Sequence, residues 1–595
     1  MTGAQQRRIE AKCRNGVTLV PMRFLELAKT FENIEATRKR GEISASLAEA
    51  LKRADPEEAK IIAYLIQGRL GPPYAAPDLG INERRIAEAI AQVVGKKTEK
   101  VWSLYKDVGD FGIVAEKLLP EQGQKLTVQQ VYDMLLEIAQ TAGSGSAEKK
   151  LGHLVRLFSQ LGKIEARYLA RIAQGKLRFG VGDVTLIDAL SHSLGKPKLR
   201  ADIERAYAFS SDLGLVASVS MTEGEKGLEK IRPTPGRPVL PALAQRLPSP
   251  AAAVTRLGKV LVEPKYDGLR LQLHKDGKRI WLFTRRLEDI TGALPSLVDA
   301  AKDQIKATKV ILDGEVIGYD PKTKRFLSFQ ETVRRKRKHQ VEEMSFLYPV
   351  RYYGFDILAL NRQDLIPKPQ YERSQKLAQV IKEKQEGPIF VTPQIETDSA
   401  EELVKFLHEM LSKRLEGVVV KRPDAPYHVG ARLFDWIKIK REHSGEALDT
   451  YDLVVVGYFK GRGKRSRLGV GSLLCAVYDP SNARFRTVTR VGSGLSDEEW
   501  KDFHKKLDKA SVAGKPPQVD SLIQADVWVE PRFVIEVAAA EITRSPRHTC
   551  GKVDKEQGYS LRFPRMVQFR FDRRPDDATT EKEIVDLYQV GAGSS

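Results

Sequence analysis

The stretch "EPKYDGLR", residues 263–270, places one lysine, Lys265, between two carboxylates and follows it with an Asp-Gly pair. An apolar run precedes the lysine and the alternating run "LRLQLHK" follows it, so the pattern predicts two strands joined by a tight turn. We expect Lys265 to lie on a loop at the edge of a sheet and not within a strand. Arg270 and Gln272 share one face of the second strand, because side chains alternate along a strand. Arg270 can therefore share the pocket of the lysine.

Nearby cations could make this lysine a nucleophile. A protonated amine is a poor nucleophile, and cations together with partial desolvation lower a lysine pKa. The stretch "RLFDWIKIK", residues 432–440, supplies them, because as a strand it carries Trp436, Lys438 and Lys440 on one face and isoleucines on the other. An ordinary solvent-facing strand explains the same pattern, so both interpretations stay open here.

Carboxylates, an aromatic ring and a further arginine occur in comparable strand contexts. Glu315 and Glu416 each lie in an apolar run, and Mg²⁺ needs one or two carboxylates beside phosphate oxygens. Phe355 offers a flat face for a purine base, although a core role is commoner for phenylalanine. Arg285 suits either a phosphate clamp or a salt bridge. Each of these signals is modest alone.

The sequence pattern divides the chain into an extension, a helical part and two strand-rich parts. Its 595 residues suggest three or four domains. Apolar residues return every three or four positions through residues 22–231, which predicts an all-α domain. Four prolines in "RPTPGRPVLPAL", residues 232–243, then indicate a linker. Strands dominate residues 232–441, and short strands with turns through residues 442–595 predict a small β-barrel or sandwich with a flexible tail. Residues 1–21 are expected to be an extension.

Composition limits the class of protein. The 98 Lys and Arg residues against 78 Asp and Glu residues leave a formal net charge of +20, which favours a polyanionic partner, although solubility alone also explains it. Three scattered cysteines build neither a disulfide framework nor a four-cysteine zinc site. The sequence contains no long apolar segment, so it does not predict a membrane-spanning helix. We expect a cytoplasmic monomer.

The order of the motifs is more specific than any one of them. Read along the chain, they resemble the motif series of ATP-dependent DNA ligases, in the covalent nucleotidyltransferase superfamily, through residues 263–578. The helical part is similar to the DNA-binding domain of archaeal and eukaryotic replicative ligases, with two segments similar to those that grip the DNA backbone. The motifs are "EPKYDGLR", "FTRRLEDIT", "DGEVIGYD", "YYGFDIL", "EGVVVK", "DWIKIK" and "SLRFPRMVQFRFDRRPDDAT", and the gripping segments are "TAGSGSAEKK" and "LRFGVGDVTLIDAL".

The resemblance implies a fold and a role for each matched residue. The fold is a multidomain α+β protein with an all-α DNA-binding domain, an α/β-type antiparallel-sheet nucleotidyltransferase core and a C-terminal OB-fold barrel. Lys265 becomes covalently adenylated. Around it, Glu263 contacts the adenosine, Phe355 stacks on the adenine, and Arg270 and Arg285 contact nucleotide or nick phosphates. Glu315 and Glu416 take ribose and divalent-metal contacts, while Arg432 and Lys438, with Lys440 nearby, line the α-phosphate side.

The last motif implies a pyrophosphate-orienting group formed by Arg570, Asp572 and Arg573. Ligases often end this motif in Asp-Lys, whereas this chain has Asp572-Arg573. An arginine keeps the charge but replaces a point charge by a planar fork. The contact geometry at Arg573 is therefore expected to differ from that of a lysine.

The implied activity is sealing of nicks in double-stranded DNA in replication, repair and recombination. ATP is the expected cosubstrate, with ADP and GTP left open, and Mg²⁺ is the expected metal, which Mn²⁺ replaces. A sliding clamp is a natural partner. The alternatives are an RNA ligase or mRNA guanylyltransferase of the same superfamily, and a noncatalytic nucleic-acid scaffold. The helical N-terminal part and the "RFPR" ending favour a DNA ligase, and the missing four-cysteine element disfavours an NAD-dependent one.

Overall fold

The structure is a computed structural model in which the chain forms two compact units, each described by itself. The units are Met1–Leu247 with Ala251–Lys438, and Pro248–Pro250 with Ile439–Ser595. Asp572, the side chain of Lys440 and most of residues 1–21 lie outside the described part. The structure describes residues 13–14, 17–18, 20–37, 39–175, 177, 181–247, 249–320, 325–327, 349–385, 387–413, 415–440, 450–461, 468–554, 556–570 and 573–593.

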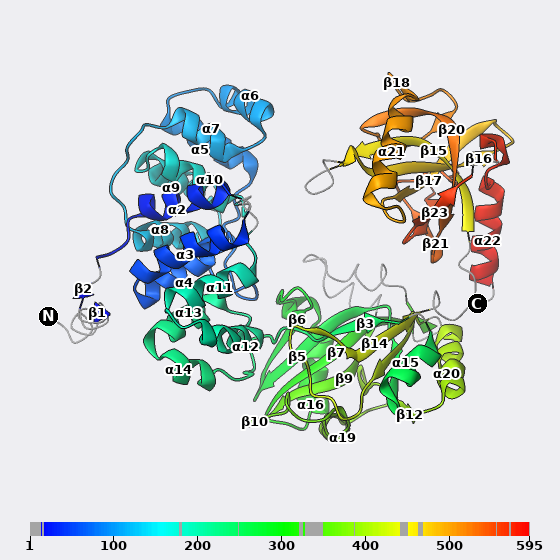
Figure 1. The fold of residues 1–595 in the computed structure, drawn as a ribbon, viewed down its shortest axis with the longest axis horizontal. Helices are drawn as coiled ribbons and strands as arrows, with labels where there is room; N and C mark the ends of the chain where they lie inside the picture. Colours follow the sequence, from blue (N-terminus) through cyan, green and yellow to red (C-terminus); the bar gives the residue numbers. More distant parts are fainter. Residues whose placement is uncertain are drawn as a thin grey trace. The chain divides into compact units, whose positions relative to one another are not determined.

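The N-terminal region is helical, as the apolar periodicity predicts (Figure 1). Two short strands, β1 (Cys13–Arg14) and β2 (Val17–Thr18), precede it. The helical elements are α2 (Phe24–Glu35), α3 (Arg40–Arg53), α4 (Pro56–Leu65), α5 (Glu83–Val93), α6 (Thr98–Val108), α7 (Phe111–Leu118), α8 (Val128–Gln140), α9 (Ser146–Ser159), α10 (Lys163–Ala173), α11 (Asp183–Ser193), η1 (Pro197–Leu199), α12 (Arg200–Ser210), α13 (Leu213–Thr222) and α14 (Gly224–Lys230).

Local chemistry and one buried ion network explain why these helices begin and pack as they do. Asp55 accepts hydrogen bonds from the first backbone N–H groups of α4 and forms a capping box with Glu58. Deeper in the bundle, Arg171 of α10 is almost fully buried and bonds both Glu35 of α2 and Asp110, the N-cap of α7. Removing one member would leave buried charge unpaired, so the network specifies how these helices meet.

Two sheets form the core of the first unit. One has the strand order β10-β9-β7-β5-β6, with β11 beside β9 and β8 beside β7, and the other has the order β12-β4-β13-β14-β3. The elements are β3 (Leu243–Arg246), α15 (Pro250–Leu257), β4 (Val260–Lys265), β5 (Leu269–Asp276), β6 (Arg279–Thr284), η2 (Thr291–Ala293), α16 (Pro295–Gln304), β7 (Lys309–Asp320), β8 (Arg325–Phe326), β9 (Val350–Leu360), β10 (Gln363–Asp364), α19 (Gln370–Val380), β11 (Ile389–Val391), β12 (Ile395–Thr397), α20 (Ala400–Ser412), β13 (Gly417–Lys421) and β14 (Arg432–Lys440).

Alternation along β5 divides its two faces. Leu271 and Leu273 are fully buried in an apolar cluster that includes Leu297 of α16 and Leu377 of α19. The polar residues between them therefore point to the opposite face. The sequence "HKDGKRI", residues 274–280, contains the pair Asp276-Gly277, which predicts a hairpin turn. The structure confirms this turn, because Gly277 has φ +59° and the β5–β6 hairpin closes around it.

The second unit is built mainly from strands. Its larger sheet has the order β18-β20-β15-β16-β17-β19 with β23 beside β20, and β21 pairs with β22. The elements are β15 (Thr450–Lys460), β16 (Val470–Asp479), β17 (Arg484–Val491), α21 (Asp497–Asp508), β18 (Ser511–Val512), β19 (Val519–Asp520), β20 (Val527–Ala538), β21 (Glu541–Ser545), β22 (Gly558–Arg562), β23 (Arg565–Phe569), η5 (Pro575–Asp577) and α22 (Glu581–Gly593).

The predicted architecture is confirmed as a helical N-terminal region, a sheet-rich core and a C-terminal sheet domain. The exact domain boundaries stay predictions. Over the described residues, no helix combines the length and the apolar character needed to cross a membrane.

Candidate active site

Lys265 is the last residue of β4, where it pairs with Gly417 of β13. Its carbonyl oxygen accepts a hydrogen bond of 3.0 Å from the backbone N–H of Glu416, and its ammonium group contacts the Glu416 carboxylate. The expectation of a loop position is therefore wrong, because ladder pairing with β13 continues through the lysine. The side chains of Lys265 and Glu416 are 21% and 22% exposed, so a ligand can reach both.

A buried ion pair lies two residues before the lysine. Glu263 pairs with Lys421 at 2.8 Å, and both side chains are almost fully buried. Burial raises the pKa of Glu263 to about 7, although Lys421 opposes this rise. Lys421 also donates to the carbonyl oxygen of Phe355 at 2.9 Å. Glu263 thus holds a lysine that the sequence interpretation had not singled out, and its contact with adenosine stays a prediction.

Two aromatic rings stand over this ion pair. Phe355 and Trp436 meet edge to face, with their ring centroids 5.9 Å apart. The Lys421 ammonium group lies 4.9 Å from the Phe355 centroid and 4.4 Å from the Trp436 centroid. Trp436 is buried, whereas Phe355 keeps part of its surface exposed. Phe355 is thus the ring of this pair that a flat base can still contact.

Arg270 is held by a second buried network. Its Nε and Nη2 atoms donate to the two oxygens of Asp313 at 3.2 and 2.7 Å. Its Nη1 atom donates to the carbonyl oxygen of Ala242 at 2.6 Å, and the Tyr427 hydroxyl donates to Asp313 at 2.6 Å. Asp313 is fully buried, so this arginine provides the charge compensation that its carboxylate needs.

Glu315 lies on β7 directly opposite Arg270 of β5. Burial raises the pKa of Glu315 to about 8; Asp313 and Glu416 add to the rise, while Lys265 and Arg270 oppose it. No ion pair joins its carboxylate to another side chain that the structure describes. Among the described residues, no ion pair thus occupies the Glu315 carboxyl group near the lysine.

Two exposed arginines extend the positive charge of this region. Partial burial lowers the pKa of Arg285, and the charges of Arg270 and Arg432 lower it further. Arg285 follows β6, whereas Arg432 begins β14, and both are exposed. Lys438 lies further along β14 and is partly exposed. Lys440 ends that strand, but its side chain lies outside the described part.

Comparisons with known proteins identify the family. Three family models match the chain: "DNA ligase N terminus" over residues 23–191, "ATP dependent DNA ligase domain" over residues 241–440 and "ATP dependent DNA ligase C terminal region" over residues 466–573. The chain belongs to the ATP-dependent DNA ligases. The resemblance seen in the motifs is confirmed, and the matches favour a DNA ligase over the RNA ligase, guanylyltransferase and scaffold alternatives.

Full-length relatives agree with this assignment. A "Probable DNA ligase" of Dictyoglomus turgidum is 45% identical over 570 residues, which cover 96% of this chain and 98% of the relative. A "DNA ligase" of Pyrobaculum calidifontis is 43% identical over 582 residues, which cover 96% of this chain and 99% of the relative. The solved structure "Pmar-Lig_PreS3" matches 91% of this chain and 99% of its own, with a TM-score of 0.53 and 16% identity, which shows the fold alone.

Metal use is typical of DNA ligases, and the side chains here fit a hard divalent cation that shares its coordination with substrate. Within the described ranges, no group of three or more His, Cys, Asp or Glu side chains could hold a metal ion by itself. Glu315 and Glu416 nevertheless influence each other electrostatically beside Lys265. Two carboxylates suffice for Mg²⁺ when phosphate oxygens and water complete its shell.

The C-terminal arginines of this ligase share one carboxylate. Arg570 Nη1 lies 3.0 and 3.1 Å from the two oxygens of Asp452 on β15, and Arg573 Nε lies 3.5 Å from one of them. Among the described residues, two guanidinium groups thus contact the one carboxylate of Asp452. Asp572, the third predicted member, lies outside the described residues.

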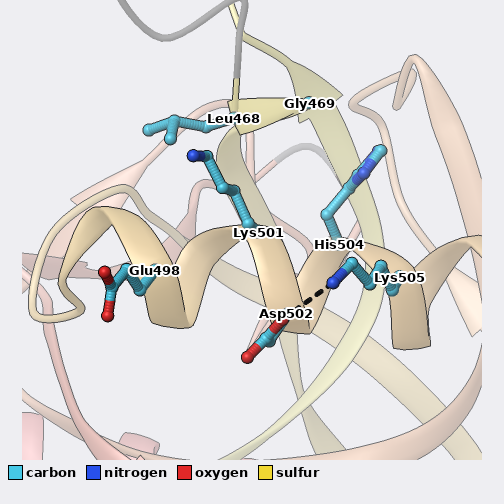
Figure 2. Close-up of a pocket in the computed structure, with 7 residues that line it drawn as sticks. All are labelled: Leu468, Gly469, Glu498, Lys501, Asp502, His504 and Lys505. Atoms are coloured by element: carbon cyan, nitrogen blue, oxygen red, sulfur yellow. Dashed lines mark hydrogen bonds and ion pairs between the residues drawn. The ribbon is translucent and has the colours of Figure 1, made fainter.

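The second unit also has a hollow of about 560 Å³ along α21 (Figure 2). Lys505 and Asp502 form an ion pair of 3.1 Å on its wall, and the His504 ring packs against Gly469. Positive and negative side chains alternate there, so the hollow has no single charge preference. It is lined by Leu468, Gly469, Glu498, Lys501, Asp502, His504 and Lys505, and no residue predicted from the motifs is among them.

Proposed function

We propose that this ligase seals nicks in double-stranded DNA through a lysyl-AMP intermediate on Lys265. The observation that carries the proposal is the partly exposed Lys265 in contact with Glu416 at the end of β4, within the region that matches the ligase catalytic domain. Glu315 lies in the same electrostatic neighbourhood, and so do the cations around it. This arrangement offers a nucleophile, carboxylates and phosphate-binding groups in one place.

The first step forms a bond between the Lys265 nitrogen and the α-phosphorus of ATP and breaks the bond from that phosphorus to pyrophosphate. The attacking amine must first lose a proton, and the Glu416 carboxylate is the group in contact with it. Arg285 and Arg432 stabilise the negative charge of the transferring group. A bound divalent cation would supply further charge compensation at Glu315 and Glu416.

The next two steps move the AMP group and close the nick. The 5′-phosphate at the nick attacks the phosphorus of lysyl-AMP, which returns Lys265 as a free amine and leaves AMP on the DNA end. The 3′-hydroxyl then attacks that activated phosphate, and AMP leaves as the phosphodiester bond forms. The net charge of +20 supports binding of a duplex mainly through its phosphates.

Finer properties follow as part of the same proposal. Mg²⁺, replaced by Mn²⁺, is the proposed metal, and ADP and GTP are cosubstrates to compare with ATP. Phe355 is proposed to stack on the base, Glu263 to contact the adenosine, and Lys438 with Lys440 to line the α-phosphate side. Arg570, Asp572 and Arg573 are proposed to orient pyrophosphate. We also propose a cytoplasmic monomer that acts in replication, repair and recombination, with a sliding clamp as a partner.

The test is self-adenylation with α-labelled ATP and Mg²⁺ in the absence of DNA. The wild-type protein should keep the label, and Lys265→Ala should lose it. Lys259→Ala is the matched control, because Lys259 lies just before β4 in an exposed ion pair with Glu396. Persistence of the label in Lys265→Ala would contradict the nucleophile. Sealing of nicked RNA without sealing of nicked DNA would contradict the substrate.

A further inference from the structure

Residues 236–243, which lead from the stretch after α14 into the first residue of β3, are fixed by hydrogen bonds along their length and are called the segment below. Pro238 and Pro241 have no N–H group, and each other residue of 236–243 has an acceptor for its own. A loose linker would leave these groups to water. The bonds run from Gly236 to His274 Nδ1 (3.2 Å), from Arg237 to the Thr234 carbonyl (3.0 Å), from Val239 to Gln272 Oε1 (3.0 Å), from Leu240 to the Ala208 carbonyl (2.9 Å), from Ala242 to the Tyr427 hydroxyl (3.0 Å) and from Leu243 to the Ala431 carbonyl (2.9 Å).

Three alternate residues of β5 hold the segment from the core side. Arg270, Gln272 and His274 share the face opposite the leucines, and they bond Ala242, Val239 and Gly236 in that order. The segment therefore runs along β5 in the opposite direction to the strand. The set Arg270, Gln272 and His274 is called the β5 rack below.

Gln272 is the central member of the β5 rack. It accepts from the Val239 N–H and donates to the Val239 carbonyl at 2.6 Å, as a neighbouring strand would. Burial lowers the pKa of His274 to about 3, so its ring is neutral. Since Nδ1 accepts from Gly236, the ring hydrogen lies on Nε2 and points to the Gln272 oxygen, 3.3 Å away.

Arg270 links the β5 rack to the candidate active site. It makes four hydrogen bonds, two to Asp313 and one each to Ala242 and Tyr427, and a guanidinium group has about five N–H donors. Most of its donors are therefore already committed to protein groups. A bidentate grip on a phosphate would require it to release Asp313 or the segment.

The helical region holds the same segment from its other side. Ser211, just after α12, donates through its hydroxyl to the Pro238 carbonyl at 2.7 Å. Phe209 packs with Val239 and Ala242 in one buried apolar cluster that also contains Trp436 of the aromatic pair. The segment is thus enclosed between the end of α12 and β5.

We propose that residues 236–243 form a docked positioning segment, held by the β5 rack, on which transfer of AMP to DNA depends and self-adenylation does not. The groups proposed for self-adenylation lie in the core and in the C-terminal unit, and none of them lies in the helical region. Transfer to a nick requires the helical region and the core to hold one duplex, and this segment sets where they join. The inference rests on the proposed function for its reaction steps, whereas the docking itself is tested separately by hydrogen exchange.

Gln272→Leu is the test variant, because it removes both bonds to Val239 and keeps the side chain near its original size. Gln304→Leu is the matched control. Gln304 is also buried and donates to two backbone carbonyls, those of Lys382 and Ile389, both at 3.0 Å, away from the segment. Both full-length variants lose a buried glutamine with two backbone partners, so a general loss of stability affects them alike.

Three measurements are compared: hydrogen exchange of residues 236–243, the rate of self-adenylation, and single-turnover transfer of AMP from adenylated protein to nicked DNA. Gln272→Leu should speed exchange in the segment and slow AMP transfer about tenfold, which corresponds to about 1.4 kcal/mol. Its self-adenylation should match that of Gln304→Leu. Gln304→Leu should retain wild-type exchange in the segment and wild-type AMP transfer.

Equal AMP transfer by the two variants, unchanged exchange in the segment, or an equal loss of both reaction steps in Gln272→Leu would each overturn the inference. Ser211→Ala is the second variant if Gln272→Leu does not fold, because it loosens the segment from the helical side and leaves β5 intact. A wild-type protein that does not self-adenylate would instead refute the proposed function, and the exchange measurement would still decide whether the segment is docked.

Discussion

Replacing Glu315 by glutamine should stabilise the protein while it removes activity. The folded-state pKa of Glu315 is about 8, against a reference value of 4.5, with burial as the main cause. A raised carboxyl pKa means that the folded state binds the proton more tightly than the unfolded state does. The stabilisation that proton binding at Glu315 gives the folded state is therefore complete below pH 4.5 and is lost as the pH rises to about 8. Glutamine does not titrate and escapes this loss.

The size of the effect follows from the two pKa values. At pH 7 the unfolded carboxyl group is about 2.5 pH units above its own pKa and is ionised, whereas the folded one is still mostly protonated. This difference costs the folded state about 3 kcal/mol of stability. Glu315 keeps part of its surface exposed, so we expect about 1–3 kcal/mol to be measured. For a domain of this size, that corresponds to a melting temperature roughly 2–12 °C higher.

The assay is calorimetric melting of wild type and Glu315→Gln between about pH 5 and about pH 8.5, together with self-adenylation. The gain in melting temperature should be small at the acid end and should grow with pH, while self-adenylation is lost. Glu401→Gln is the control, because Glu401 is exposed on α20 and its replacement should give no pH-dependent gain. A gain independent of pH, or a glutamine variant less stable than wild type at the alkaline end, would refute the reasoning.

Two further changes separate structural from ligand-binding charge. Lys421→Met leaves Glu263 buried without its partner and should destabilise the fold by about 3–5 kcal/mol in chemical denaturation. The double variant Lys421→Met/Glu263→Gln should recover most of that loss. A double variant as unstable as the single one would contradict this. Arg285→Ala removes an exposed cation, so melting should hardly change, but half-maximal self-adenylation should need roughly tenfold more ATP. Unchanged ATP dependence would remove Arg285 from the phosphate site.

The sequence predicted the elements of the core better than their connections. Alternation correctly placed Arg270 and Gln272 on one face of a strand, and the pair Asp276-Gly277 correctly predicted the hairpin after β5. Both signals are local, because period and turn chemistry act within a few residues. The position of Lys265 within β4 was mispredicted, because pairing with Gly417 depends on a strand about 150 residues further along the chain.

The buried partners could not be read from the sequence for the same reason. Lys421 was visible at the end of "EGVVVK", but only the β4–β13 register shows that it reaches Glu263. A lysine that closes an otherwise apolar strand was the one available signal. Asp313 and Tyr427 carried no comparable signal, since the residues they join come from β5, β7 and the segment before β3. The prolines of that segment predicted a linker between domains, which stays a prediction, and they did not indicate that the segment is docked.

Burial separates the charges of the candidate site into two classes, and this division bears on which arginines bind phosphate. Three ion pairs of the core are neutral as units, and none of their side chains is more than 15% exposed: Glu263–Lys421, Arg270–Asp313 and Arg373–Asp356. Breaking any of them to bind a ligand would leave one buried charge uncompensated. Arg285 and Arg432 are exposed and do not belong to these pairs. Phosphate binding therefore costs less free energy at Arg285 and Arg432 than at Arg270. The guanidinium group of Arg270 contributes instead by holding its carboxylate partner and the segment in place.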